Sequence, residues 1–118
     1  MSRCYVSFYR NIAGFVMNKL KEIAWVLADT DDEYLIEEFL RSILTKYEID
    51  EISSRWELVK LLHGGMTQRK IAERLGLSLC KITRGSRELK KANSSFKTMI
   101  ERYGKNMKKH PASLKQGE

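Results

Sequence analysis

Two short helical segments separated by only three residues are the feature that most restricts the fold of this 118-residue chain. Thr67 can cap a helix over 68–75, and Gly76 can end that helix with a left-handed backbone. Ser78 can cap a second helix, which we expect from Leu79 to about Lys91. Two short helices joined in this way are typical of a helix-turn-helix.

The apolar residues of this segment fit the interior of such a motif. With Gly76 at the turn, Ala72 lies four residues earlier, where a small side chain lets the two helices cross closely. The residues expected to point into the wedge between the helices are Ile71, Leu75, Leu77 and Ile82. Gly85 departs from the pattern, because that position is normally apolar. An ordinary helical hairpin remains the alternative, since apolar periodicity by itself produces many false matches.

The same segment is strongly basic. Residues 67–91 hold eight Lys and Arg against two acidic residues. Lys70 and Lys81 each fall in the first turn of an expected helix, where the helix macrodipole favours acidic side chains by roughly a few tenths of a kcal/mol. A nearby phosphate would compensate for both lysines. The charges therefore favour DNA binding, and the alternative is a solvated face of exposed lysines.

Helical periodicity accounts for most of the remaining chain. We expect further helices over 17–28, 32–44, 46–62 and 96–103. Capping side chains in 29–32 separate the first two, and Thr45 with Glu48 matches a capping box for the third. Gly64-Gly65 and Gly104 are the expected helix ends. The apolar stripes are wider than one small chain is expected to bury, so we predict an all-α fold that forms an obligate homodimer.

Length and composition are those of a single helical domain. The chain is 42% hydrophobic and 31% charged with one Pro, which fits a soluble helical protein. No apolar run approaches the roughly 20 residues that a membrane helix needs. Arg3 and Arg10 interrupt what would have to be the hydrophobic region of a secretory signal. We therefore expect a cytoplasmic protein without a membrane partner.

Signatures of catalysis and of metal binding are missing from the sequence. Cys4 and Cys80 lie far apart without a neighbouring His, so they suggest neither a metal site nor a disulfide framework. His63 and His110 are isolated, and no Ser or Cys nucleophile has a recognisable base. We expect neither an enzyme nor a metalloprotein.

The formal charge of +7 is segregated along the chain. Residues 17–53 hold four basic against ten acidic side chains, whereas residues 54–118 hold sixteen basic against five acidic. This asymmetry is expected of a protein that binds a polyanion. The expected domain is 17–104. Residues 1–16 would be an N-terminal arm or extension that need not be ordered, with Met17 as one hypothesis for the natural start, and 105–118 a basic disordered tail.

Residues 66–90 read MTQRKIAERLGLSLCKITRGSRELK, a run that closely resembles the helix-turn-helix of the tryptophan repressor family. ITRGS at 82–86 is its most specific part. Leu44-Thr45, followed ten residues later by Arg55, is similar to the segment by which that family builds its corepressor pocket. The resemblance implies an intertwined homodimer with helix-turn-helix reading heads. It would bind L-tryptophan as corepressor and then double-stranded operator DNA, and so repress genes of tryptophan biosynthesis or transport.

The resemblance also implies which residues bind the ligand. An indole is flat and electron-rich, so a guanidinium plane on each face suits it through stacking worth about 0.5–2 kcal/mol apiece. Arg55 and Arg84 are the two candidates, and by resemblance Arg84 also pairs with the ligand carboxylate. The carbonyls near Ser42 and Leu44, with the Thr45 hydroxyl, would receive the ammonium. The expected ligand-binding residues are Leu44, Thr45, Arg55, Arg84, Gly85 and Glu88.

Several residues depart from the family pattern. Lys70 stands where members often have an acid, and Ala72 replaces a basic residue that can contact DNA. Glu88 falls in Arg-Glu-Leu-Lys where the family commonly reads Asn-Ser-Leu-Lys, although a carboxylate could serve an ammonium well. Gly85 would let the ligand approach the recognition helix closely.

The expected DNA face covers both helices of the motif. Its residues are Gln68, Arg69, Leu79, Cys80, Lys81, Thr83 and Lys90. Two other classes of protein stay open on the residues alone. One is a ligand-independent helix-turn-helix module, as in a transposase or a replication initiator. The other is a helical interaction protein whose basic half meets acidic partners or a membrane surface.

Overall fold

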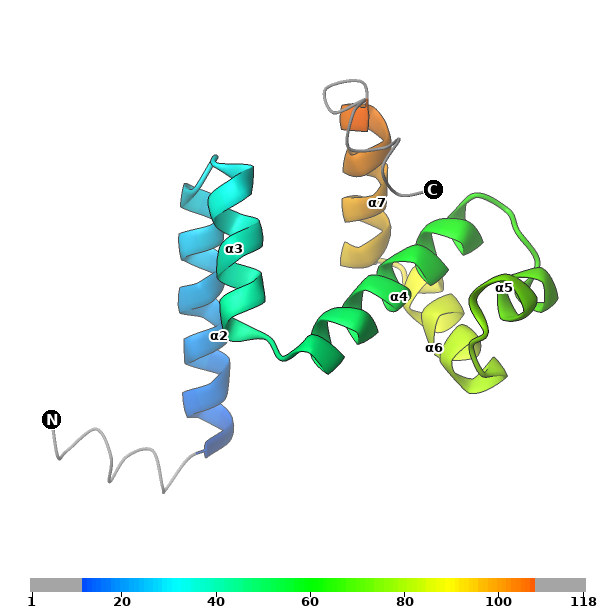
Figure 1. Cartoon of the computed structure of the whole chain (residues 1–118), viewed down its shortest axis with the longest axis horizontal. Helices are drawn as coiled ribbons and strands as arrows, with labels where there is room; N and C mark the ends of the chain where they lie inside the picture. The colour runs from blue at the N-terminus through cyan, green and yellow to red at the C-terminus, as the bar shows by residue number, and fades with distance from the viewer. Residues whose placement is uncertain (1–11, 108–118) are drawn as a thin grey trace, which may run out of the picture. The chain divides into compact units, whose positions relative to one another are not determined.

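The computed structural model describes residues 12–107, with side chains from residue 18 onward. Its helices are α2 (Ile12–Asp29), α3 (Glu33–Ile43), α4 (Lys46–His63), α5 (Gln68–Leu75), α6 (Leu79–Lys90) and α7 (Ser95–Asn106) (Figure 1). The described residues contain no strand, so the all-α prediction is confirmed for them. The chain divides into two units after Lys46, which are described separately below. Residues 1–11 of the expected arm and 108–118 of the expected tail lie outside the described residues.

The first unit begins with α2, which starts at Ile12 and not at Met17 as expected. The prediction was wrong because it required a capping residue, whereas the stretch before Met17 contains no proline and continues the helix. Asp32 caps α3, since its Oδ1 accepts hydrogen bonds from the backbone N–H groups of Tyr34 (3.1 Å) and Leu35 (3.2 Å). The cap expected within 29–32 is thereby confirmed.

The first unit buries none of its described side chains. Trp25 and Tyr34 are 62% and 73% exposed. Further large apolar side chains that remain exposed on α2 and α3 are Leu20, Val26, Leu35 and Ile43. The apolar stripe of α3 is thus present, but this unit contains no packed core of its own.

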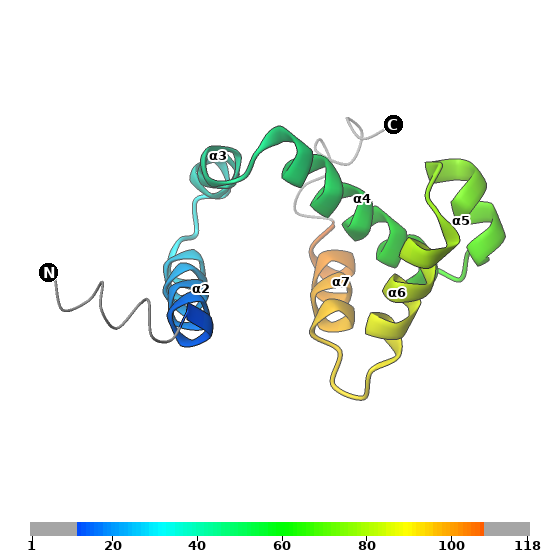
Figure 2. The ribbon, with the colours of Figure 1, turned by 90° about the horizontal axis from the view of Figure 1, so that it is seen from below.

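The second unit has a core to which α4, α5, α6 and α7 all contribute. Its buried residues are Leu58, Val59, Ile71, Ile82 and Ile100. Figures 1 and 2 show α4 alongside α6 and α7 in both views, and α6 in contact with α5. Ile71 and Ile82 are fully buried, and Leu75 and Leu77 pack against them. The predicted wedge is therefore confirmed.

The helix-turn-helix forms because each helix carries its own start and stop signal. Thr67 Oγ1 accepts from the Lys70 backbone N–H (3.3 Å), and Ser78 Oγ accepts from that of Lys81 (3.4 Å). Gly76 ends α5 with a φ of 65°, the left-handed conformation that glycine adopts without steric cost. These caps confirm the predicted helices.

A glycine turn also ends α4. Gly65 has a φ of 94°. The Met66 N–H donates to the Leu61 carbonyl (3.1 Å), and the Gly65 N–H donates to the Leu62 carbonyl (3.1 Å). This pair of hydrogen bonds is a Schellman motif, which satisfies carbonyls at the end of a helix. Only four residues then separate His63 from the start of α5.

Helix α7 continues through Gly104 to Asn106, so the prediction that Gly104 ends it was wrong. Glycine ends a helix where its backbone turns left-handed, and among the described glycines only Gly65 and Gly76 do so. Aromatic rings attach α7 to α4. Trp56 stacks on Phe96 with 5.9 Å between ring centroids and meets Tyr103 edge-on at 5.8 Å.

Ile82→Ala is expected to destabilise the fold, because Ile82 is fully buried where α6 packs on the core. The free energy of unfolding should fall by about 2–5 kcal/mol, the usual cost of such a cavity. Leu79→Ala is the matched control on the same helix, since Leu79 is 63% exposed, and it should change stability by less than about 0.5 kcal/mol. Urea denaturation followed by circular dichroism at one protein concentration measures both. Equal losses would contradict the core described here.

Candidate functional site

A pocket of about 420 Å³ lies between α4 and α6, entirely within the second unit. Pockets for small molecules commonly have this size. Its lining residues are Glu51, Ser54, Arg55, Leu58, Val59, Leu77, Lys81, Arg84, Gly85, Glu88 and Phe96. Four of the six residues that the sequence assigned to the ligand, Arg55, Arg84, Gly85 and Glu88, therefore line one pocket.

Two helical stripes face each other across this pocket. The α4 stripe consists of Glu51, Ser54, Arg55 and Leu58, and the α6 stripe of Lys81, Arg84, Gly85 and Glu88. Each stripe follows the spacing i, i+3, i+4, i+7, which is one face of an α-helix. A ligand between them would contact the core helix and the expected recognition helix at once.

Gly85 brings the two helices close together. A Cβ atom at this position would lie 3.1 Å from Cδ2 of Leu58 and 3.3 Å from Cγ2 of Val59, tighter than ordinary van der Waals contact. Leu58 and Val59 are both buried, so they have little room to move. From the sequence, Gly85 is expected to let the ligand approach the recognition helix closely. In the structure the absence of a Cβ at Gly85 lets α4 pack closely against α6, and Gly85 also lines the pocket.

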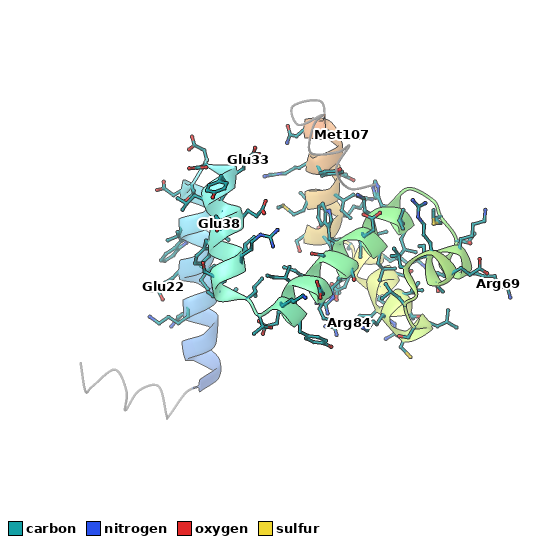
Figure 3. All side chains as sticks on the ribbon, in the orientation of Figure 1. Glu22, Glu33, Glu38, Arg69, Arg84 and Met107 are labelled. Atoms are coloured by element: carbon teal, nitrogen blue, oxygen red, sulfur yellow. The ribbon has the colours of Figure 1, made fainter. Side chains whose placement is uncertain are left out.

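The charged residues of the pocket carry both signs. Arg55 comes from α4 and Arg84 from α6, so guanidinium groups reach the pocket from two helices (Figure 3 labels Arg84). Glu51 Oε1 lies 3.1 Å from Lys81 Nζ, and Glu88 Oε1 lies 2.9 Å from Lys91 Nζ. With apolar walls from Leu58, Val59 and Phe96 beside these charges, the pocket can accept an apolar group that carries ionised substituents.

The remaining predicted ligand residues belong to the first unit. Leu44 is the C-cap of α3, and its N–H donates to the Leu40 carbonyl (3.0 Å). Thr45 follows it in the connection to α4. The Ser42 hydroxyl donates to the Glu38 carbonyl of its own helix (2.8 Å). Their part in ligand binding stays a prediction.

Sequence reasoning missed Glu51, Ser54 and Phe96 as pocket residues. Glu51 lies four residues before Arg55, and Ser54 lies three residues after Glu51 and four before Leu58, so helical spacing places both on the α4 stripe. Apolar periodicity does not reveal this stripe, because its residues are of mixed polarity. Phe96 had been assigned only to the apolar face of its own helix.

All seven predicted DNA-contacting side chains are exposed. Gln68 and Arg69 lie at the start of α5, and Figure 3 shows Arg69 pointing outward from that helix. The others lie on α6, namely Leu79, Cys80, Lys81, Thr83 and Lys90. Neither helix has an acidic residue in its first turn. The exposed N-terminal ends of both helices are therefore compatible with phosphate groups.

No group of three or more His, Cys, Asp and Glu side chains in residues 12–107 could hold a metal ion. None of the helices in this range is long and apolar enough to cross a membrane.

Comparison with known proteins identifies one family. The model of the Trp repressor protein family matches residues 18–104, which include both stripes and the whole helix-turn-helix. A Trp operon repressor homolog of Chlamydia trachomatis serovar L2 is 37% identical over 71 residues, which cover 56% of this chain and 76% of the relative. No solved structure gives a significant match.

Other relatives agree with this match. A Trp operon repressor homolog of Chlamydia caviae is 39% identical over 64 residues, covering 53% of this chain and 63% of the relative. One of Xylella fastidiosa strain M23 is 40% identical over 65 residues, covering 54% of this chain and 67% of the relative. Because the family model spans most of the chain, the resemblance suggested by the ITRGS motif is confirmed, and the chain belongs to the Trp repressor protein family of DNA-binding regulators.

Proposed function

We propose that this protein is a homodimeric transcriptional repressor that binds operator DNA through α5 and α6 when L-tryptophan fills the pocket between α4 and α6. The observation that carries the proposal is the pair of facing stripes, because one bound molecule there would touch both the core and the recognition helix. The relatives' names support genes of tryptophan metabolism as the targets.

The chemistry of the pocket supports an indole amino acid. Arg55 and Arg84 supply two guanidinium planes, each able to stack on an aromatic face with about 0.5–2 kcal/mol of attraction. Arg84 would also pair with the carboxylate, and Glu88 can accept a hydrogen bond from the ammonium. In this proposal, Leu44 and Thr45 add backbone and hydroxyl oxygens around the ammonium.

The electrostatics of α5 and α6 support a DNA partner. Lys70 occupies a first turn in which an acid would be more favourable, and a phosphate would offset that cost. Gln68, Arg69, Thr83 and Lys90 would contact the backbone or the base edges from exposed positions. In a dimer, two such heads would enter successive major grooves.

The apolar surface of the first unit supports a homodimer. Trp25, Val26, Tyr34 and Leu35 are each more than half exposed, and none of the described side chains of this unit is buried. Exposed apolar residues of this number on two successive helices mark a protein interface. A second copy of the chain is the partner that the family resemblance implies, and it would supply the core that this unit lacks.

The first expected outcome concerns assembly. Light scattering on the full chain at micromolar concentration should give twice the 13.8 kDa of one chain. Leu35→Asp should shift the mass toward the monomer, because it places a charge on the exposed apolar face of α3. Glu38→Asp on the same helix keeps the charge and should leave the mass unchanged. A folded monomer of the unaltered chain would contradict the dimer.

A second outcome concerns the DNA face. The logarithm of the DNA affinity should fall linearly with the logarithm of salt concentration, and Lys90→Ala should reduce that slope by about one. Lys97→Ala removes an exposed lysine from α7, outside the proposed interface, and should leave the slope unchanged. Fluorescence anisotropy of labelled operator DNA at several salt concentrations measures the slope. A slope that Lys90→Ala does not alter would remove Lys90 from the interface.

The third outcome separates a corepressor from a ligand-independent DNA-binding module. Tryptophan and DNA should each raise the other's affinity by the same factor, typically about 5- to 150-fold. Arg84→Ala should abolish tryptophan binding by removing a stacking plane and the carboxylate partner, whereas Arg55→Ala should weaken it less. Calorimetric titration with L-tryptophan measures the first effect, and gel shifts with and without it measure the coupling. Equal DNA affinity under both conditions would favour the ligand-independent module.

A further inference from the structure

The ion pair between Lys81 and Glu51 links the recognition helix to the core helix. Lys81 Nζ lies 3.1 Å from Glu51 Oε1, although the two residues are 30 positions apart in the sequence. Two other lysines of this unit pair within their own helix or its cap, Lys60 with Glu57 and Lys91 with Glu88. The Lys81 pair is therefore a tertiary contact, made by the residues that begin the two facing stripes.

Lys81 lies in the first turn of α6, where the helix dipole favours a negative charge. Lys81 is the third residue of α6, and its backbone N–H already donates to Ser78 Oγ, so the cap forms without the Lys81 side chain. The first turn of α6 contains no acid of its own. Glu51 thus supplies, from α4, the negative charge that a DNA phosphate would supply from outside.

We propose that Glu51 is an internal competitor of DNA for Lys81, which lowers the DNA affinity of the ligand-free protein. The inference rests on the proposed function, in which α6 contacts phosphates. Glu51 occupies one of the three N–H donors of the Lys81 ammonium and offsets its positive charge, so a phosphate oxygen that contacts Lys81 gains less than it would from an unpaired ammonium.

The exposure of the Lys81 and Glu51 side chains sets the expected change in DNA affinity. The Lys81 side chain is 51% exposed and that of Glu51 29%. Ion pairs at such partly exposed positions make small contributions, so removing the competitor should change the DNA affinity by about two- to fivefold. A change of this size alters the fraction of operator DNA that is bound at a given protein concentration. It is too small to unfold the protein.

The test is the Glu51→Gln variant of the full chain, which keeps the size and shape of the side chain. Without added tryptophan, its affinity for operator DNA in anisotropy titrations should rise by about two- to fivefold. Glu57→Gln is the matched control, because it makes the same change in charge on the same helix while Glu57 pairs with Lys60 inside α4. It should change the affinity less. Equal gains in both variants would show a general charge effect and overturn the proposal.

A double-mutant cycle with Lys81→Gln separates competition from simple repulsion. If Glu51 acts through Lys81, Glu51→Gln should give no further gain in the Lys81→Gln background. The same gain in both backgrounds would overturn the proposal. These results are distinguishable from a failure of the proposed function. If the unaltered protein binds no operator DNA in the presence of tryptophan, the function fails, whereas normal binding with an inert Glu51→Gln variant rejects only the role of Glu51.

Discussion

The contact of Gly85 with Leu58 and Val59 sets the distance between α4 and α6, and the arrangement of the second unit depends on it. Any larger residue at position 85 would have to push against two buried side chains. With glycine there, the α4 and α6 stripes approach closely enough to enclose a pocket. Helix α6 thus presents one face to the core, through Ile82, and another to the pocket. Its exposed residues remain available to DNA in the proposed function.

The two units differ in the interactions that stabilise each of them. In the second unit four helices share a small core of five buried residues, reinforced by the rings of Trp56, Phe96 and Tyr103. The first unit shows no buried side chain among those described. Under the proposed function, its folding would therefore be coupled to assembly, and the stability of the dimer would depend on protein concentration.

Local signals explain why much of the second unit was predictable from sequence. Thr67, Gly76 and Ser78 act within a few residues of themselves, so the bounds of α5 and α6 followed from the chain alone. Gly104 carries the same local signal without taking the left-handed backbone, because whether a glycine ends a helix depends on its surroundings. The site likewise contains residues that the sequence predicts and residues whose role depends on how the helices pack.

Within the site, Arg55, Arg84, Gly85 and Glu88 were expected because the family motif names their positions, and they do line one pocket. The pair of Glu51 and Lys81 could not be expected, since it joins residues 30 positions apart and depends on how α6 packs on α4. Glu51 breaks no apolar pattern, and Lys81 stands out in the sequence only as a basic residue in the first turn of its helix. Pairing of charges between helices is a property of packing, which periodicity along one helix does not contain.

The Schellman turn at Gly64–Met66 has a consequence for how this chain can change in length. Its hydrogen bonds from Met66 and Gly65 tie the connection to the end of α4, so little slack exists before α5 begins. One residue inserted in α4 would rotate the start of α5 by about 100° around the helix axis, since a turn contains 3.6 residues. That rotation would move Ile71 out of the core. An insertion or deletion between α4 and α6 should therefore disturb the packing of the second unit.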